Sequence, residues 1–464
     1  MIGEIVPKLL NFLLLPVMTR YLSPEDYGII GYVDAVILFV FIFSILSLNS
    51  YLIREYFEND SLKNRKRLIG NFFLFLATYN VILFFVLFSL LYFLYQYIDF
   101  QFDILPILTL ALFVNLLEIF NLFPQIIYRV QEKAKAYIYF VISKTFFQIL
   151  AVLFFLEYFY HGPISKYYGL AFISMIYAGI SFFIVSRNAI FSFNVDQLKD
   201  GFVFSFPLIL AALSFAVIDM SDRIILEEYV SMSELGIYSI AYTLGFSINI
   251  IIKGSYKAFE PLIFKNSKKE NFLNIFTSIK NEYLVMVFAT CIFVILFSKE
   301  IVLLILPKDY YSAYLLIPII VLAAFAKGVY TIQVLLLMIR KDTRLISKIM
   351  IFGAFLNIGI NLIFIEEYGV IVAALSTLVA FSIMAVLAHR NGFEYYNFSY
   401  LTEIKDYIFF GILGAITYII YFYFNIPVTY RSIVIKVVIF LVLVNLMMRV
   451  YSLSIFKQVV KKID

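Results

Sequence analysis

The chain has 464 residues, of which 63% are hydrophobic and only 14% are charged, and its mean hydropathy is +0.95. A soluble protein of this length needs a larger charged fraction to cover its surface, so the composition excludes that class. Continuous apolar runs, each close to the roughly 20 residues that cross a bilayer as a helix, also exclude a transmembrane β-barrel of short alternating strands. We therefore predict an all-α, polytopic membrane protein without an extramembrane domain.

The apolar runs predict about fourteen membrane spans along the chain. They lie at 3–19, 28–52, 70–95, 104–127, 137–158, 169–186, 202–220, 235–255, 283–306, 314–338, 349–365, 370–388, 407–424 and 433–451.

Lysine and arginine are concentrated in alternate loops, which predicts the orientation of the chain. The rich loops and the C-terminal tail hold Arg54, Lys63, Arg65, Lys66, Arg67, Arg129, Lys133, Lys135, Lys257, Lys265, Lys268, Lys269, Arg340, Lys341, Arg344, Lys348, Lys457, Lys461 and Lys462. The other loops offer little beyond Arg20, Lys166, Lys308 and Arg431. Because such an excess marks the cytoplasmic side, we expect both termini in the cytoplasm of a multi-pass inner-membrane protein. Contact with anionic lipid or with a phosphorylated substrate is an alternative role for these loops.

Two short stretches of the chain repeat each other. Tyr21–Ile29, with the sequence YLSPEDYGI, reappears as YVSMSELGI at Tyr229–Ile237, and Tyr168–Leu170 corresponds to Tyr368–Val370. The matches are collinear, and each half would contain six spans, so both halves have the same orientation. This predicts a parallel repeat of two pseudo-symmetric six-helix lobes, 1–190 and 200–395, followed by an extra helix pair and a basic cytoplasmic tail in 400–464.

The stretch Pro7–Gly28, PKLLNFLLLPVMTRYLSPEDYG, resembles the opening of Wzx-type polysaccharide repeat-unit flippases of the multidrug/oligosaccharidyl-lipid/polysaccharide exporter superfamily. Shorter similarities lie at Asp222–Leu226, Glu234–Tyr238 and Tyr368–Val370 with Ala373 and Ala374. The resemblance implies two six-helix lobes around a central cavity. It also implies translocation of undecaprenyl-pyrophosphate-linked oligosaccharide from the cytoplasmic to the outer leaflet for surface polysaccharide such as O-antigen or capsule. Polysaccharide polymerase and chain-length machinery would then be partners, together with membrane lipids.

Ionisable residues inside the spans are the candidate site residues, because a buried charge in a membrane is costly. The cationic candidates for a pyrophosphate are Lys8, Lys144, Lys253 and Lys327. A lysine suits a mobile phosphate because it acts as a point charge. For Lys8 and Lys253 the alternative is snorkelling to the interface, and for Lys144 it is snorkelling or an internal salt bridge.

The acidic candidates are fewer. Asp34 and Glu118 are candidates to bind a coupling H⁺ or Na⁺, and an ion pair with a lysine is the alternative for both. Asp219 and Arg223 stand four residues apart, the spacing of a helical salt bridge, for which we expect a structural or gating role.

Other motifs are sparse, and we expect neither an enzyme nor a nucleic-acid partner. The single cysteine, Cys291, excludes an internal disulfide, and the two histidines, His161 and His389, form no metal-ligand spacing, so no cofactor is expected. Two other functions compete with the flippase. A multidrug or cation antiporter of the same superfamily would favour an acidic cavity and twelve spans. A glycan polymerase or ligase would carry a large external loop.

Overall fold

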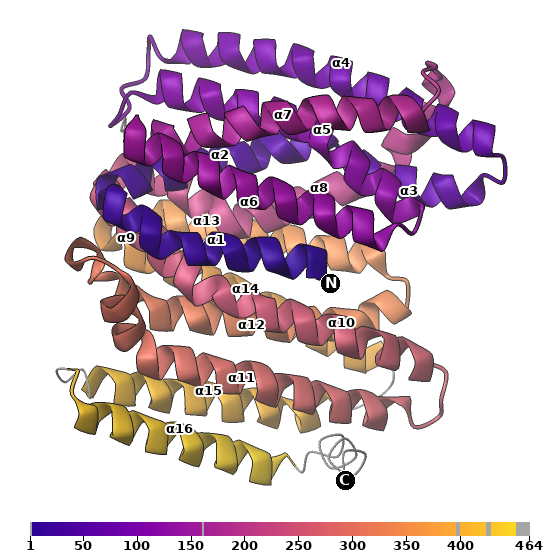
Figure 1. The fold of residues 1–464 in the computed structure, drawn as a ribbon. Helices are drawn as coiled ribbons and strands as arrows, with labels where there is room; N and C mark the ends of the chain where they lie inside the picture. The colour runs from indigo at the N-terminus through magenta and orange to yellow at the C-terminus, as the bar shows by residue number, and fades with distance from the viewer. Residues whose placement is uncertain (1, 160–161, 396–399, 424–427, 452–464) are drawn as a thin grey trace. The chain divides into compact units, whose positions relative to one another are not determined.

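The computed structural model describes residues 2–159, 162–395, 400–423 and 428–451 (Figure 1). The described residues are mostly helical and include no strand, in agreement with the predicted all-α class. Among them, twelve helices or helix pairs are long and apolar enough to cross a membrane, and Ile408–Phe422 is a shorter apolar helix. The basic tail at Lys457, Lys461 and Lys462 lies outside the described residues.

The chain divides into two compact units, Met1–Gly236 and Ile237–Asp464. The first unit contains α1 (Ile2–Tyr21), α2 (Pro24–Ile45), α3 (Leu48–Glu58), α4 (Leu62–Leu94), α5 (Ile104–Val130), α6 (Ala134–Tyr158), α7 (Ile164–Asn188), α8 (Val195–Tyr229) and the first residues of α9 (Met232–Gly245). Within it, α7 packs against both α5 and α6, and α1 packs on α6. The lobe boundaries predicted from the repeat, 1–190 and 200–395, stay a prediction.

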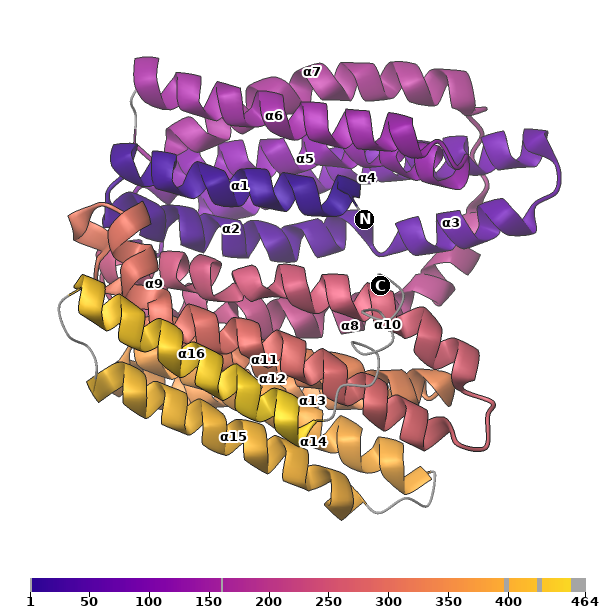
Figure 2. The same ribbon diagram turned by 60° about the horizontal axis from the view of Figure 1, so that its bottom comes forward.

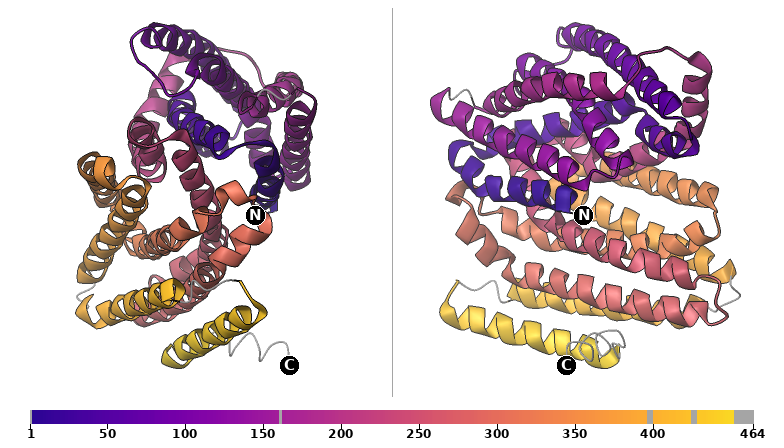
Figure 3. Two further views of the ribbon diagram at one scale, coloured as in Figure 1. Left: turned by 90° about the vertical axis from the view of Figure 1, so that its left-hand side faces the viewer. Right: turned by 45° about the vertical axis from the view of Figure 1, so that its right-hand side comes forward.

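The second unit is centred on α12. It contains the rest of α9, then η1 (Phe246–Ile248), α10 (Asn249–Asn266), α11 (Phe272–Ile305), η2 (Lys308–Tyr310), α12 (Ala313–Ile339), α13 (Thr343–Tyr368), α14 (Val370–Tyr395), α15 (Tyr400–Tyr423) and α16 (Tyr430–Val450). Helix α12 packs against α14 and α11, while α15 and α16 both lie along α11 (Figure 2). Figure 3 shows this last pair, in yellow, at the margin of the unit.

The repeated sequence motif forms the same local structure twice. At the start of α2, the backbone N–H of Ser23 donates to the Asp26 carboxylate (2.8 Å), and the N–H of Asp26 donates to Ser23 Oγ (3.2 Å). At the start of α9, Ser231 and Glu234 make the same reciprocal pair at 3.2 and 3.3 Å. Both are capping boxes, which satisfy N–H groups that a helix N-terminus leaves without partners.

The two copies of the motif also touch each other within the first unit. A Cβ placed on Gly28 would lie 1.9 Å from the carbonyl oxygen of Met232, and one on Gly236 would lie 1.8 Å from that of Pro24. Glycine is therefore required at both positions, because backbone atoms approach there more closely than any side chain allows. The contact is therefore reciprocal between the two copies.

The predicted second span, 28–52, is broken in the structure. Helix α2 ends at Ile45, Leu46 and Ser47 have φ of 53° and 52°, and α3 begins at Leu48. Side chains of neighbouring helices satisfy the carbonyl groups that the break exposes: Tyr79 Oη donates to Phe43 O (3.2 Å), Asn80 Nδ2 to Ser44 O (2.9 Å) and Ser205 Oγ to Ser47 O (3.3 Å). Irregular backbone in a membrane segment is tolerated under this condition.

The predicted eighth span, 235–255, is also interrupted. The 3₁₀ turn η1 separates α9 from α10, and the Ser247 hydroxyl donates to Leu244 O at 2.6 Å. A short 3₁₀ stretch inside a helix tightens the backbone locally and often marks a functional hinge. Here it places Phe246 beside α12, as described below.

Candidate functional site

Glu118 and Lys144 form an ion pair between α5 and α6. The Lys144 side chain is 10% exposed and that of Glu118 25% exposed. The Glu118 carboxylate also accepts from Gln148 Nε2 (3.2 Å) and Ser174 Oγ (2.7 Å), and Gln148 Nε2 donates to Ser174 Oγ (3.1 Å). The structure therefore contains the ion pair that the sequence analysis gave as the alternative for Glu118 and for Lys144. A role of Lys144 in substrate binding and of Glu118 in ion binding stays a prediction.

The polar contacts continue along the seam between α5 and α7. Ser181 Oγ donates to Asn121 Oδ1 at 3.0 Å, and Asn121 Nδ2 donates to the carbonyl of Ser174 at 3.3 Å. Asn121, Ser174 and Ser181 are fully buried. Such a seam favours one register of α5 against α7, because buried polar groups are stable only when they are hydrogen-bonded.

Asp34 of α2 is paired with the first turn of α7. Lys166 Nζ lies 2.6 Å from Asp34 Oδ2, and Tyr167 Oη donates to Asp34 Oδ1 at 3.0 Å. The Asp34 side chain is 46% exposed, whereas that of Lys166 is 18% exposed. The pair ties α2 to α7 and leaves part of the carboxylate accessible.

Arg223 of α8 is buried among acceptors of its own helix. Its guanidinium lies 3.1 Å from the Asp222 carboxylate and donates to the backbone carbonyl of Asp219 at 3.0 Å. The ion pair in the structure thus includes Asp222, whose side chain is fully buried, in addition to the backbone contact with the predicted partner Asp219. The structural or gating role expected for Asp219 and Arg223 stays a prediction.

Lys8 and Lys253 are exposed on α1 and α10, respectively. Lys327, in contrast, is half-buried in the middle of α12. Its Nζ lies 5.2 Å from the ring centroid of Phe246 in η1 and 5.1 Å from that of Phe381 in α14. Phe246 is itself stacked on Tyr242, with centroids 4.1 Å apart. Aromatic faces attract a cation most strongly when water is excluded, so the two rings stabilise the ammonium inside the second unit.

The structure also reveals buried polar residues that sequence reasoning missed. Lys436 of α16 is paired with Glu300 of α11 at 2.6 Å, and Lys280 of α11 is fully buried. Between α13 and α14, Asn357 Nδ2 donates to Ser376 Oγ (3.1 Å), and Asn361 lies one turn along α13. Lys436 could have been found from the sequence, because it interrupts an apolar span. Lys280 could not, because the predicted ninth span began at residue 283, whereas α11 begins at Phe272.

Within the part of the chain that is described, no group of three or more His, Cys, Asp or Glu side chains could hold a metal ion. Cys291 is buried in α11.

Comparison with known proteins gives one family and one fold. The profile of a family described as "Polysaccharide biosynthesis protein" matches residues 1–267. No curated protein matches the chain by sequence. The solved structure of the lipid II flippase MurJ in an inward closed conformation is similar with a TM-score of 0.70 at 15% identity, over 97% of this chain and 98% of that one.

Multidrug transporters share the fold over a shorter stretch. An inward-facing multidrug resistance MATE family transporter of the MOP superfamily is similar with a TM-score of 0.69 at 12% identity, over 84% of this chain and 96% of that one. The MATE multidrug transporter DinF-BH is similar with a TM-score of 0.59 at 15% identity, over 84% of this chain and 93% of that one. The flippase structure thus covers more of this chain than either transporter does.

Proposed function

Because the chain belongs to the polysaccharide biosynthesis protein family, as its opening residues predicted, we propose that it moves lipid-linked oligosaccharide repeat units from the cytoplasmic to the outer leaflet. The substrate would be an undecaprenyl-pyrophosphate-linked glycan destined for a surface polysaccharide such as O-antigen or capsule. The two halves of the chain would expose the substrate site alternately to each side of the membrane. The protein would act as a transporter and not as an enzyme, with polymerase and chain-length machinery receiving the product.

The observation that best supports this proposal is the share of the chain over which its fold matches a known flippase. The flippase structure is matched over 97% of this chain, whereas the multidrug transporters are matched over 84%. The fold alone does not select the substrate, but the family and the long match together favour a lipid-linked glycan.

The charge of the candidate residues supports the same substrate. Lys144 is neutralised by Glu118, so it is a weaker candidate for an anionic head group. Lys253 is exposed on α10, and the Lys327 ammonium lies close to two aromatic rings in the middle of α12. A pyrophosphate needs such cations, because moving its charge into a low-dielectric site without them is prohibitive.

Lys327 provides the sharpest test. Lys327→Ala should leave the protein abundant and membrane-inserted but reduce glycan export by about 10- to 100-fold, the value of one hydrogen bond to a charged group. Lys327→Arg keeps the charge and should lose less. Export is measured as surface polysaccharide in a deletion strain that expresses each variant, with Lys308→Ala in the exposed turn η2 as the matched control.

Normal export by a well-expressed Lys327→Ala variant would contradict this role for Lys327. The function itself is tested separately by the deletion strain, which should accumulate lipid-linked repeat units on the cytoplasmic face of its membrane. Unchanged surface glycan together with increased sensitivity to cationic drugs would instead identify a multidrug transporter.

A further inference from the structure

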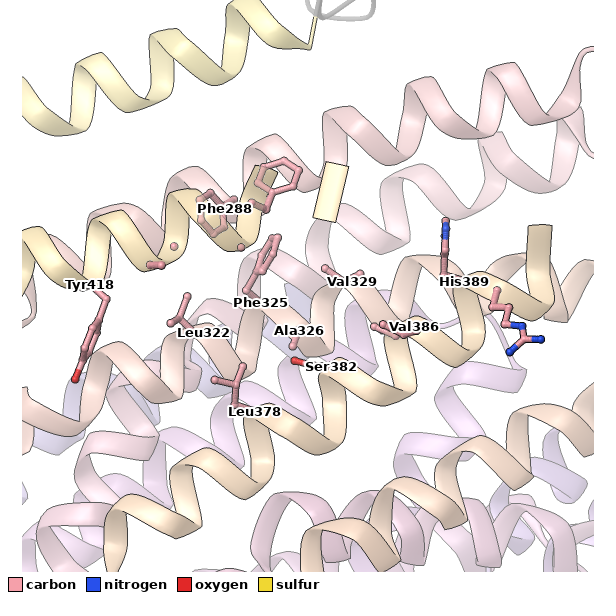
Figure 4. A pocket seen from close by; sticks show the side chains of 16 residues that line it. Phe288, Leu322, Phe325, Ala326, Val329, Leu378, Ser382, Val386, His389 and Tyr418 are labelled. Atoms are coloured by element: carbon pink, nitrogen blue, oxygen red, sulfur yellow. The ribbon is translucent and has the colours of Figure 1, made fainter. Parts of the chain in front are cut away.

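A narrow apolar pocket lies within the second unit, between α11, α12, α14 and α15 (Figure 4). Its volume is about 520 Å³. Figure 4 shows Tyr418 at one end of the pocket and His389 at the other, with Leu322, Phe325 and Ala326 between them. The pocket is therefore elongated along the helices, with Tyr418 and His389 at its ends and Ser382 as a polar side chain between them.

Three phenylalanines from different helices form the inner wall. Phe288 of α11, Phe325 of α12 and Phe410 of α15 lie with ring centroids 4.7, 5.1 and 5.6 Å apart, in tilted or edge-on contact. Such a cluster is well packed and does not collapse into the neighbouring space. On α15, Gly411 leaves open space, because a Cβ placed there would meet no atom within 4 Å. The pocket is thus bounded by packed aromatic rings on one side and has room beside Gly411.

The length of the pocket matches one leaflet of a bilayer. Leu378 and Arg390 of α14 both line it and are twelve residues apart, which is about 18 Å along a helix. One leaflet of a hydrocarbon core of about 30 Å is about 15 Å thick. This length is that of one ordinary acyl chain.

The end of the pocket at His389 carries the Arg390 guanidinium, which is exposed and only loosely paired. The Arg390 side chain is 61% exposed and lies 3.8 Å from Glu394, an exposed pair that contributes little and can rearrange. His389, beside it, is buried. At this end of α14, Arg340 from the basic loop after α12 donates to Asn391 O at 2.8 Å, so this is the side predicted to be cytoplasmic. Anionic phospholipids are concentrated in that leaflet.

We propose that this pocket binds one anionic phospholipid of the cytoplasmic leaflet, with an acyl chain against the phenylalanine wall and the headgroup phosphate at Arg390. A polyprenyl chain is much longer than one leaflet, so it fits the observed dimensions less well. The proposal concerns a resident lipid and does not depend on which substrate the protein transports.

Native mass spectrometry of the full chain, released from its membrane in mild detergent, tests the proposal. The wild-type protein should retain one phospholipid, and added phosphatidylglycerol should bind in preference to phosphatidylethanolamine. Gly411→Leu fills the pocket and should abolish this adduct. Gly359→Leu, at an equally open position of α13 that does not line the pocket, should retain it. Ala415→Leu, one turn further along α15, is the second filling variant if Gly411→Leu fails to accumulate.

Arg390→Gln tests the headgroup contact. It should reduce the preference for phosphatidylglycerol about fivefold, the effect of one basic residue near an anionic surface. An adduct that survives both filling variants, or a wild-type protein that carries polyprenyl phosphate or no lipid, would overturn the proposal. An unchanged lipid preference in Arg390→Gln would overturn the placement of the phosphate.

Discussion

At the scale of single residues, the charges inside the helices are neutralised or shielded by specific neighbours. Glu118 neutralises Lys144, and two aromatic rings cover the Lys327 ammonium. The sequence could identify these residues as charges that are unfavourable inside a membrane, because they lie within apolar runs. It could not assign their partners, because Glu118 and Lys144 lie 26 residues apart and meet only when α5 packs on α6.

The ion pair of Glu118 predicts an asymmetric response to mutation. Lys144→Ala leaves a mostly buried carboxylate without its cation and should destabilise the protein by somewhat less than the ~3–5 kcal/mol of a fully buried pair, since Glu118 is partly exposed. The double variant Lys144→Met with Glu118→Leu should recover most of the loss. Thermal unfolding in detergent measures both, and a Lys144→Ala variant as stable as the wild type would rule out a tight pair.

At the scale of elements, the second and eighth spans carry irregular backbone where the sequence predicted continuous helices. The break after α2 depends on side chains from α4 and α8, which take over the role that helical N–H groups would otherwise have. No local signal predicts it, since Leu46 and Ser47 are ordinary residues in an apolar run. The tertiary contacts decide the conformation there.

The break after α2 should therefore be sensitive to Asn80, which is buried and donates to the carbonyls of both Ser44 and Leu76. Asn80→Leu keeps the approximate volume but leaves the Ser44 carbonyl without its donor, so we expect a loss of about 1–3 kcal/mol. Thr78→Val, which removes only an exposed hydroxyl that bonds within its own helix, is the matched control. Equal unfolding temperatures for the two variants would contradict this explanation of the break.

The reciprocal glycine contact makes a second prediction at this scale. Gly28→Val and Gly236→Val each force a side chain into backbone atoms less than 2 Å away, which no rotamer can relieve, so both variants should lose export. Gly179→Val, at a position on α7 with open space around it, should behave as the wild type. The readout is surface glycan normalised to protein abundance, and export by either motif variant at the wild-type level would show that the contact is dispensable.

At the scale of the whole molecule, the orientation in the membrane is a prediction that the distribution of basic residues supports. Reporter fusions after Asp464 and in the loop that holds Lys308 should report the cytoplasm and the opposite side, respectively, because lysine and arginine excess marks cytoplasmic loops. Signals from the same compartment at both positions would require a different number of membrane crossings.

The sequence by itself determined the fold class, the approximate spans and the family. The fold class and the spans depend on local composition, because an apolar run of about twenty residues must be a helix in lipid, whatever surrounds it. The family depends instead on the specific residues of Pro7–Gly28 and the shorter similar stretches. The repeated motif at Ser23 and Ser231 could likewise be recognised in the sequence, since a capping box is made by residues three apart. Only the tertiary structure decided which charges are paired, where the second and eighth spans break and where the acyl-chain pocket lies. Each of these depends on side chains that are remote in sequence, and helix packing alone brings them together.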